Sequence, residues 1–186
     1  MSKSGSHLSS QFGGTLLELM VVLLMMAIVL AFTIPRLQEQ AAVRQLEVIS
    51  RKWVMHANFA RNQALYLGDP VQMLPRNHQD WNGGWVITSG CIARQPKVNC
   101  KARNWLSQED IYPLYFKNRG FVDPHAHGVQ IQFNAAGAAK TGQGGFLANR
   151  LILGHRHYAD LERQLILGSG GRWRICNPKT DHKGCK

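Results

Sequence analysis

The segment from Leu19 to Ile34 contains sixteen consecutive residues without a charged or strongly polar side chain. Counted from Gly14, the apolar segment is twenty-one residues long, close to the ~20 that a helix needs to cross a hydrocarbon core. One carboxylate, Glu18, lies at its front edge, where an ionisable group is costly to insert into a membrane. We therefore expect the chain to enter a bilayer and Glu18 to have a charged partner.

Three kinds of segment share this composition: a secretory signal, a plain membrane anchor and the helix of a processed assembly subunit. A secretory signal carries a small-x-small cleavage site after its apolar core. Here Gly13 and Gly14 come before the core, and no Ala-x-Ala follows it. The pattern after Pro35 continues as helix, which disfavours a cleaved signal. The anchor and the assembly helix both remain open at this point.

The residues FGGTLLELMVVLLMMAIVLAFTIP resemble the processing site and first helix of type IV pilins and pseudopilins. The resemblance implies that a prepilin peptidase removes a leader, residues 1–13, by cutting after Gly13. Gly14 would become the N-methylated N-terminus, and Glu18 and Pro35 would take the places of the family's acid and kinking proline. It also implies a single-pass protein of the bacterial inner membrane, with its head in the periplasm, that later joins a pilus at the cell surface.

In filaments of that family the acid pairs with the N-terminal amine of a neighbouring subunit. Because a buried charge is tolerated only when it is paired, Glu18 is expected to set the register between subunits. Pro35 removes one helix hydrogen bond and favours a bend where the helix leaves the bilayer. Residues 14–35 are thus expected to form the transmembrane and assembly helix, in contact with other major and minor pilins.

Residues 40–67 have the pattern of an amphipathic helix. Apolar side chains recur there at steps of three and four residues, at Ala42, Leu46, Ile49, Trp53, Ala57, Ala60, Ala64 and Leu67. Gly68-Asp69-Pro70 is a common helix stop signal. Residues 36–68 are therefore predicted to continue the first helix and to cover a sheet with this apolar stripe.

After Pro70 the hydrophobic period changes to two. Short strands are predicted at Val71–Leu74, Gly84–Thr88, Tyr112–Phe116, Val129–Phe133, Phe146–Leu153, Gln164–Leu167 and Arg172–Cys176. Residues 89–110 and 117–128 are predicted to be long loops. No alternation of strands and helices occurs, so we predict an α+β fold: one long helix packed on an antiparallel sheet, with residues 69–186 as a β-rich head.

Three segments of the head carry a second resemblance: WNGGWVIT, VQIQFNAAGAAK and ERQLILGSGGRWRIC. They are similar to the FimT/GspH branch of minor pilins and pseudopilins, in which a Trp-x-x-Gly-Trp strand, a Phe-Asn-x-x-Gly turn and a Gly-Arg-x-Arg strand recur in that order. The branch holds DNA-binding FimT-type proteins of transformable bacteria and structural subunits that prime pili or type II secretion fibres. Both functions stay open.

The formal net charge of +11 and the pI near 10.0 favour an anionic partner, either nucleic acid or acidic lipid. Gly171-Arg172-Trp173-Arg174 matches the motif that contacts the DNA backbone in FimT-type proteins. Strand alternation predicts Arg172 and Arg174 on one face, with Trp173 and Ile175 anchored in the core on the other. Alternatively, the two arginines only protect an edge strand from aggregation.

Two further basic segments could extend this site. One is the C-terminal tail with Lys179, Lys183 and Lys186, and the other is the run Arg94, Lys97, Lys101 and Arg103. If the two lie on the same side, they form a surface for the backbone of double-stranded DNA, bound without sequence preference. With about four phosphates neutralised, affinity should be micromolar or weaker and fall by roughly two decades between 50 and 200 mM salt.

The four cysteines are an even set in a head that is expected outside the cytoplasm, where disulfides persist. Three pairings are possible. We favour Cys91–Cys100 together with Cys176–Cys185, because each pair closes a short basic loop. No Cys-x-x-Cys spacing indicates a metal site.

His125/His127 and His155/His157 form two His-x-His pairs, but no cluster of carboxylates accompanies them. The sequence also has no nucleophile elbow, phosphate-binding glycine loop or paired acids at a useful spacing. We expect neither a cofactor, nor a metal, nor enzymatic activity.

Overall fold

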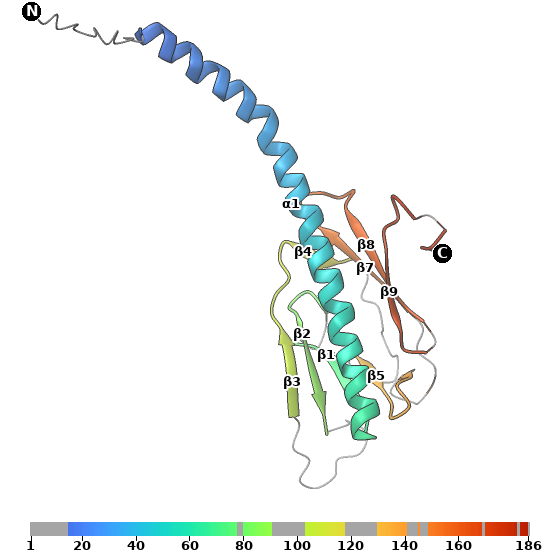
Figure 1. The fold of residues 1–186 in the computed structure, drawn as a ribbon. Helices are drawn as coiled ribbons and strands as arrows, with labels where there is room; N and C mark the ends of the chain where they lie inside the picture. The colour runs from blue at the N-terminus through green and yellow to red at the C-terminus, as the bar shows by residue number, and fades with distance from the viewer. Residues whose placement is uncertain are drawn as a thin grey trace, which may run out of the picture. The chain divides into compact units, whose positions relative to one another are not determined.

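The computed structural model describes residues 15–77, 80–90, 103–117, 130–140, 145, 149–168, 170–181 and 183–185. These residues form one helix and two antiparallel sheets (Figure 1). The elements are α1 (Leu16–Leu67), β1 (Val71–Pro75), β2 (Trp85–Ser89), β3 (Arg103–Gln108), β4 (Leu114–Phe116), β5 (Ile131–Phe133), β6 (Ala139–Lys140), β7 (Asn149–His155), β8 (Glu162–Leu167) and β9 (Trp173–Cys176).

Within the described residues, the chain divides into two units at Gln40. In the first unit, α1 exposes its apolar side chains and is long and apolar enough to cross a membrane. The hydroxyl of Thr33 donates to the carbonyl oxygen of Val29 at 2.8 Å. This bond satisfies the hydroxyl inside the helix, so that Thr33 is compatible with an apolar surrounding.

The second half of α1 packs on the sheets with the stripe that its sequence predicts. Its buried residues are Ala42, Leu46, Ser50, Trp53, His56, Ala57, Ala60 and Ala64. Leu67, the last residue of the predicted stripe, is 38% exposed instead. The helix ends where expected, because Gly68 adopts a φ of 66° and its N–H bonds the oxygen of Ala64, a left-handed C-terminal cap.

Sheet A has the strand order β3-β2-β1-β5-β6, and sheet B has the order β4-β7-β8-β9. All the neighbouring pairs are antiparallel. The strands follow the predicted ones with boundaries shifted by a few residues. The expectation of an α+β fold with a long helix on antiparallel sheet is confirmed.

Two strands lie where none was predicted. β3 occupies part of the segment 89–110 that was predicted to be a loop, and β6 is a two-residue strand beside β5. The β3 sequence RNWLSQ has its two large apolar residues next to each other, so period-two alternation is missing. A register shift between Ile87 and Thr88 accompanies this irregularity in the pairing with β2. β3 is an edge strand, where regular burial on one face is not required.

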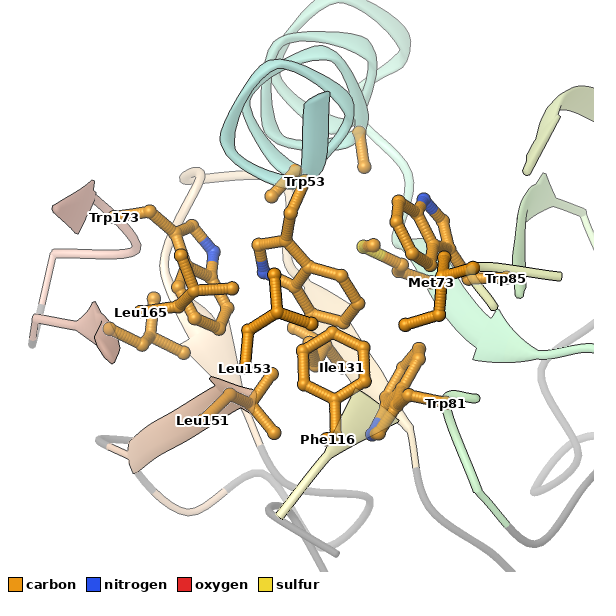
Figure 2. Close-up of a cluster of buried hydrophobic side chains, with 14 of the residues drawn as sticks. Trp53, Met73, Trp81, Trp85, Phe116, Ile131, Leu151, Leu153, Leu165 and Trp173 are labelled. Carbon is orange, nitrogen blue, oxygen red and sulfur yellow. The ribbon is translucent and has the colours of Figure 1, made fainter. Parts of the chain in front are cut away.

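Trp53 of α1 occupies the centre of the core (Figure 2). Its ring meets two tryptophans of the WNGGW segment edge to face, Trp81 at 4.9 Å and Trp85 at 4.8 Å between ring centroids. From sheet B it meets Phe116 at 5.2 Å and Trp173 at 5.6 Å. Edge-to-face pairs stabilise beyond simple burial, by about 0.5–1.5 kcal/mol each. One helix residue therefore fixes both sheets, and β9 in particular, to α1.

Candidate phosphate-binding surface

The Gly-Arg-x-Arg segment begins in the tight hairpin that connects β8 to β9. Gly168 N–H donates to the oxygen of Arg172 at 2.8 Å, and Gly171 N–H donates to the oxygen of Gly168 at 3.0 Å. Gly171 has a φ of 75°, in the left-handed region that favours glycine. A Cβ at this position would overlap the carbonyl oxygen of Gly137. The motif glycine is therefore required by local backbone conformation and by close packing.

Gly137 lies in the turn between β5 and β6, which corresponds to the predicted Phe-Asn-x-x-Gly turn. The side-chain oxygen of Asn134 accepts the N–H groups of Ala136 and Ala138 at 3.1 and 2.9 Å. Arg61 of α1 donates its Nε–H to the oxygen of Gly137 at 2.9 Å. The turn of sheet A, the hairpin of sheet B and the helix thus meet at one point.

Strand alternation places the arginines as predicted. Arg172 and Arg174 are exposed, whereas Trp173 between them is buried. The prediction that Ile175 is anchored in the core is wrong, because its side chain is 38% exposed. It lines an open groove with Val54, Met55 and Phe59 of α1, among others. β9 is the outermost strand of sheet B, so only the flank of the helix covers this end of it.

A disulfide joins Cys176 to Cys185, with 5.5 Å between their Cα atoms. It is the pairing that the sequence analysis favoured for these two residues. By alternation Cys176 projects from β9 on the same face as Arg172 and Arg174, yet it is only 2% exposed. The disulfide therefore holds the C-terminal tail against that face.

The tail is a compact series of turns. Asp181 N–H donates to the oxygen of Asn177 at 2.8 Å, and Cys185 N–H donates to the oxygen of Asp181 at 3.2 Å. The side chains of Lys179 and Lys183 are exposed on these turns. The carboxylate of Asp181 accepts the N–H of Gly184 at 2.7 Å. Two lysines of the predicted site thus belong to a segment that is fixed beside Arg174.

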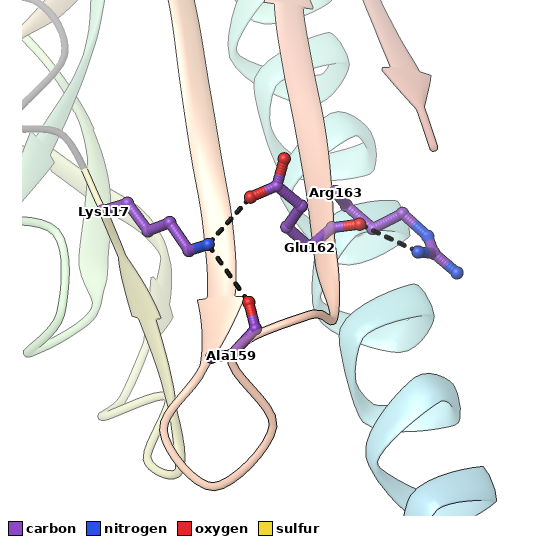
Figure 3. A network of polar contacts seen from close by, with 4 residues as sticks. All are labelled: Lys117, Ala159, Glu162 and Arg163. Carbon is purple, nitrogen blue, oxygen red and sulfur yellow. Dashed lines mark hydrogen bonds and ion pairs between the residues drawn. The ribbon is translucent and has the colours of Figure 1, made fainter. Parts of the chain in front are cut away.

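Glu162 begins β8 at the end opposite to the hairpin, and it takes part in an ion pair there (Figure 3). Lys117 Nζ lies 2.8 Å from the carboxylate of Glu162 and 3.4 Å from the oxygen of Ala159. Arg163, the next residue, donates to the backbone oxygen of Glu162 at 2.9 Å and projects to the other side of the strand, toward α1.

Arg103 is not brought to the hairpin. It begins β3, and its guanidinium lies 5.1 Å from the ring centroid of Trp105. β3 and β6 are the two opposite edges of sheet A, roughly 19 Å apart at about 4.8 Å per strand, and the Gly171 contacts are on the β6 side. Other members of the predicted sites lie outside the described residues: Gly13, Gly14, Cys91, Arg94, Lys97, Cys100, Lys101, His125, His127 and Lys186.

Of the two proposed assembly residues, Glu18 is in the first turn of α1. Its backbone N–H donates to the hydroxyl of Thr15 at 3.3 Å, and the sequence Thr15-x-x-Glu18 has the form of a capping box. Pro35 lies inside the helix, which is continuous through it. The hydroxyl of Thr15 therefore caps the first turn of α1, in which Glu18 lies.

Two buried histidines are neutral structural groups. Trp85 Nε1 donates to His56 Nδ1 at 3.0 Å, and burial, followed by the nearby charge of Lys52, lowers the pKa of His56. Burial and then the neighbouring His157 lower the pKa of His155, whose Nδ1 accepts the backbone N–H of His157 at 3.2 Å. Among the described residues, no three His, Cys, Asp or Glu side chains are grouped so that they could hold a metal.

Arg61 is the residue of this region that the sequence analysis did not single out. It lies off the apolar stripe of α1, where the pattern predicts only a solvated charge. Its bond to Gly137 joins residues 76 positions apart, and no local pattern in the sequence indicates such a pair.

No protein-family model and no curated protein sequence matches the chain. Among solved structures, the type IV minor pilin FimU of Pseudomonas aeruginosa (strain PAO1) is similar, with a TM-score of 0.55 at 14% identity over 74% of this chain and 92% of FimU. A second crystal form of FimU gives a TM-score of 0.53 at 13% identity, over 73% of this chain and 95% of FimU. The minor pseudopilin EpsH from the type 2 secretion system of Vibrio cholerae gives 0.51 at 9% identity, over 72% and 98%. The chain thus has the fold of these minor pilins and pseudopilins.

Proposed function

We propose that the chain is a minor type IV pilin that binds double-stranded DNA without sequence preference, for DNA uptake in natural transformation. Arg172 and Arg174 contact backbone phosphates, and Lys179, Lys183 and Lys186 add positive charge from the tail, as do Lys97 and Lys101. The observation that carries the proposal is the pair of exposed guanidiniums on one face of β9, with a basic tail linked by a disulfide to that face.

The geometry suits phosphate rather than base recognition. A guanidinium is planar, always charged and able to donate two parallel hydrogen bonds to phosphate oxygens. Arg172 immediately precedes β9 and Arg174 lies two residues further on, about 7 Å away for an extended backbone. Between them, the buried Trp173 packs against Trp53 of α1. Contacts of this kind position a duplex but do not read its bases. The role is one of binding and assembly, without enzymatic activity.

The same proposal covers processing and assembly. A prepilin peptidase removes residues 1–13, cutting between Gly13 and Gly14. Residues 14–35 then anchor the protein in the inner membrane, with 36–68 as the amphipathic continuation and 69–186 as the periplasmic head. Glu18 and Pro35 act when the helix joins other major and minor pilins in the fibre. The exposed apolar first half of α1 and the pilin-like fold support these assignments.

DNA binding of the full-length protein in non-ionic detergent, measured by fluorescence anisotropy with a labelled duplex, tests the function. We expect micromolar binding at 50 mM salt that falls by roughly two decades at 200 mM. Arg172→Gln and Arg174→Gln should each weaken it. An affinity that stays unchanged in both variants would exclude the proposed phosphate contacts.

A structural role without DNA binding is the second candidate: a minor pilin or a type II secretion pseudopilin that primes fibre assembly. The likeness to EpsH favours it. Co-purification of the full-length protein with the pilins, or alternatively with the secretion pseudopilins, of its own cell discriminates between the two systems. Stable capture of pseudopilins together with no DNA binding would support this candidate.

A further inference from the structure

The register of sheet B brings a third arginine to the face that carries Arg172 and Arg174. Arg150 of β7 is paired with Ile166 of β8, and Ile166 is paired with Arg174 of β9. Residues that pair directly across neighbouring strands project from the same face of the sheet. Arg150, Ile166 and Arg174 therefore form one cross-strand row.

This row lies on the solvent face. The alternating residues of the same strands, Leu151, Leu165, Leu167 and Trp173, are buried on the opposite face under α1. Arg174 is exposed, and Arg150 and Ile166 are half-buried. The side chains of Arg150 and Arg174 thus project from the outer face of the sheet. Ile166, on the strand between them, projects from the same face.

The spacing of the three arginines matches a stretch of nucleic-acid backbone. Arg150 and Arg174 are two strand spacings apart, about 10 Å, and Arg172 and Arg174 are about 7 Å apart along β9. A DNA strand carries one phosphate per ~3.4 Å of helix axis, so ~10 Å of axis presents about three charges. Three guanidiniums on one face of the sheet can therefore neutralise neighbouring phosphates of one duplex.

Among the residues that the structure describes, the acids on this face of sheet B lie away from the row. On the same face of the sheet, the next cross-strand row consists of Ile152, Gln164 and Cys176, and this row contains no acid. Glu162 comes one row further, in the ion pair with Lys117. In the tail, the carboxylate of Asp181 accepts the N–H of Gly184.

We propose that Arg150 is a third phosphate-contacting residue, so that the DNA-binding surface is the outer face of sheet B across β7, β8 and β9. This inference rests on the proposed function. The duplex lies on a surface of three strands, and the hairpin and tail form one edge of it. Arg150 supplies one contact in addition to those that the sequence motif identifies.

The test compares two arginines on opposite faces of sheet B in the full-length protein in detergent. Arg150→Gln should weaken duplex binding by about tenfold at 50 mM salt and reduce the slope of log K against log salt by about 0.9, the value for one phosphate contact. Arg163→Gln is the matched control, because Arg163 has the same charge but projects toward α1. It should leave both the affinity and the slope unchanged beyond a small general charge effect.

A gain-of-charge variant keeps the test independent of any loss of folding. Ile166→Lys adds a cation between Arg150 and Arg174 and should tighten binding and steepen the slope by up to one contact. If Arg150→Gln and Ile166→Lys both leave the slope unchanged while Arg172→Gln and Arg174→Gln reduce it, the extended surface is wrong and the proposed function stands. If none of the four variants changes the slope, the proposed function itself fails.

Discussion

Arg61 on α1 donates its Nε–H to the backbone oxygen of Gly137, 2.9 Å away, and the backbone of Gly171 packs against that same oxygen. This contact links the helix, the turn of sheet A and the hairpin that presents Arg172. The two glycines have φ values of 72° and 75°, which allow the two backbones to approach without side chains between them. The position of the arginine motif is therefore set by residues far from it in sequence.

Gly171→Ala should destabilise the fold and disturb the hairpin. Alanine at a φ of 75° is strained, and its Cβ would overlap the oxygen of Gly137. We expect a loss of about 1–3 kcal/mol in the free energy of unfolding, measured by denaturant titration with circular dichroism. Gly170→Ala is the control, because a Cβ there meets no atom within 4 Å. Equal loss in both variants would contradict the close contact.

Arg61→Met should cost more stability than its position on a helix surface suggests. The variant keeps an unbranched apolar side chain but removes a charged donor from the Gly137 oxygen, a bond worth roughly 1.5–3 kcal/mol. Arg51→Met on the same helix is the comparison, because Arg51 forms only an exposed i,i+4 pair with Glu47, worth about 0.3–0.5 kcal/mol. Chemical denaturation of the two variants measures the difference. A similar small loss in both would show that the Arg61 bond does not hold the turn.

Stability should fall as the pH decreases below about 6.5. Burial lowers the folded-state pKa of His56 and of His155, so between their folded pKa values and the unfolded value of ~6.5 the unfolded chain binds more protons. The contribution of the two histidines to stability is therefore complete above pH 6.5. It is lost as the pH falls from 6.5 toward their folded pKa values, because there the histidines protonate in the unfolded chain but not in the folded one. Thermal melting between pH 5 and 7.5 measures this effect.

His56→Gln should flatten the pH dependence, since the glutamine oxygen can still accept from Trp85 Nε1 but does not titrate. Asn58→Gln, an exposed change on the same helix, should leave the pH dependence unchanged. A wild-type melting temperature that is constant from pH 5 to 7.5 would contradict the role of the two buried histidines.

Replacing both Cys176 and Cys185 by serine should release the tail without changing the charge of the chain. The closed loop is short, with a sequence separation of 9, so the expected loss of stability is about 2–3 kcal/mol. If the proposed function holds, duplex binding should also weaken, because Lys179 and Lys183 are no longer fixed beside Arg174. Lys179→Gln combined with Lys183→Gln, with the disulfide intact, gives the effect of the charges alone. Unaltered binding in the serine variant would show that the position of the tail is irrelevant.

Glu18→Gln should block incorporation into fibres while membrane insertion remains intact. Glutamine still suits the third position of a capping box, but it lacks the charge that is expected to pair with a neighbouring N-terminal amine. Co-purification with partner pilins is the measurement, and Glu39→Gln on the same helix is the control. Normal incorporation of Glu18→Gln together with loss in Glu18→Ala would assign Glu18 to capping only.

Much of the fold follows from local patterns in the sequence. The change from a three-to-four-residue period to a period of two predicts the end of α1 at Leu67, where Gly68 caps it, and seven of the strand positions. β3 was not predicted because its apolar residues are adjacent and it is stabilised by pairing on one side. Ile175 was placed wrongly because alternation gives the side of a strand, whereas burial depends on what covers that side.

The sequence by itself determined the apolar N-terminal helix and the alternation that exposes Arg172 and Arg174. These follow from periods within one element, where the backbone geometry is nearly fixed. It also favoured the Cys176–Cys185 pair, because these two cysteines close a short loop. Only the tertiary structure decided that Arg61 holds the Gly137 turn against Gly171 and that Arg150 lies across the sheet from Arg174. Such relations depend on strand register and on the packing of elements distant in sequence, because a shift of one residue moves a side chain to the opposite face.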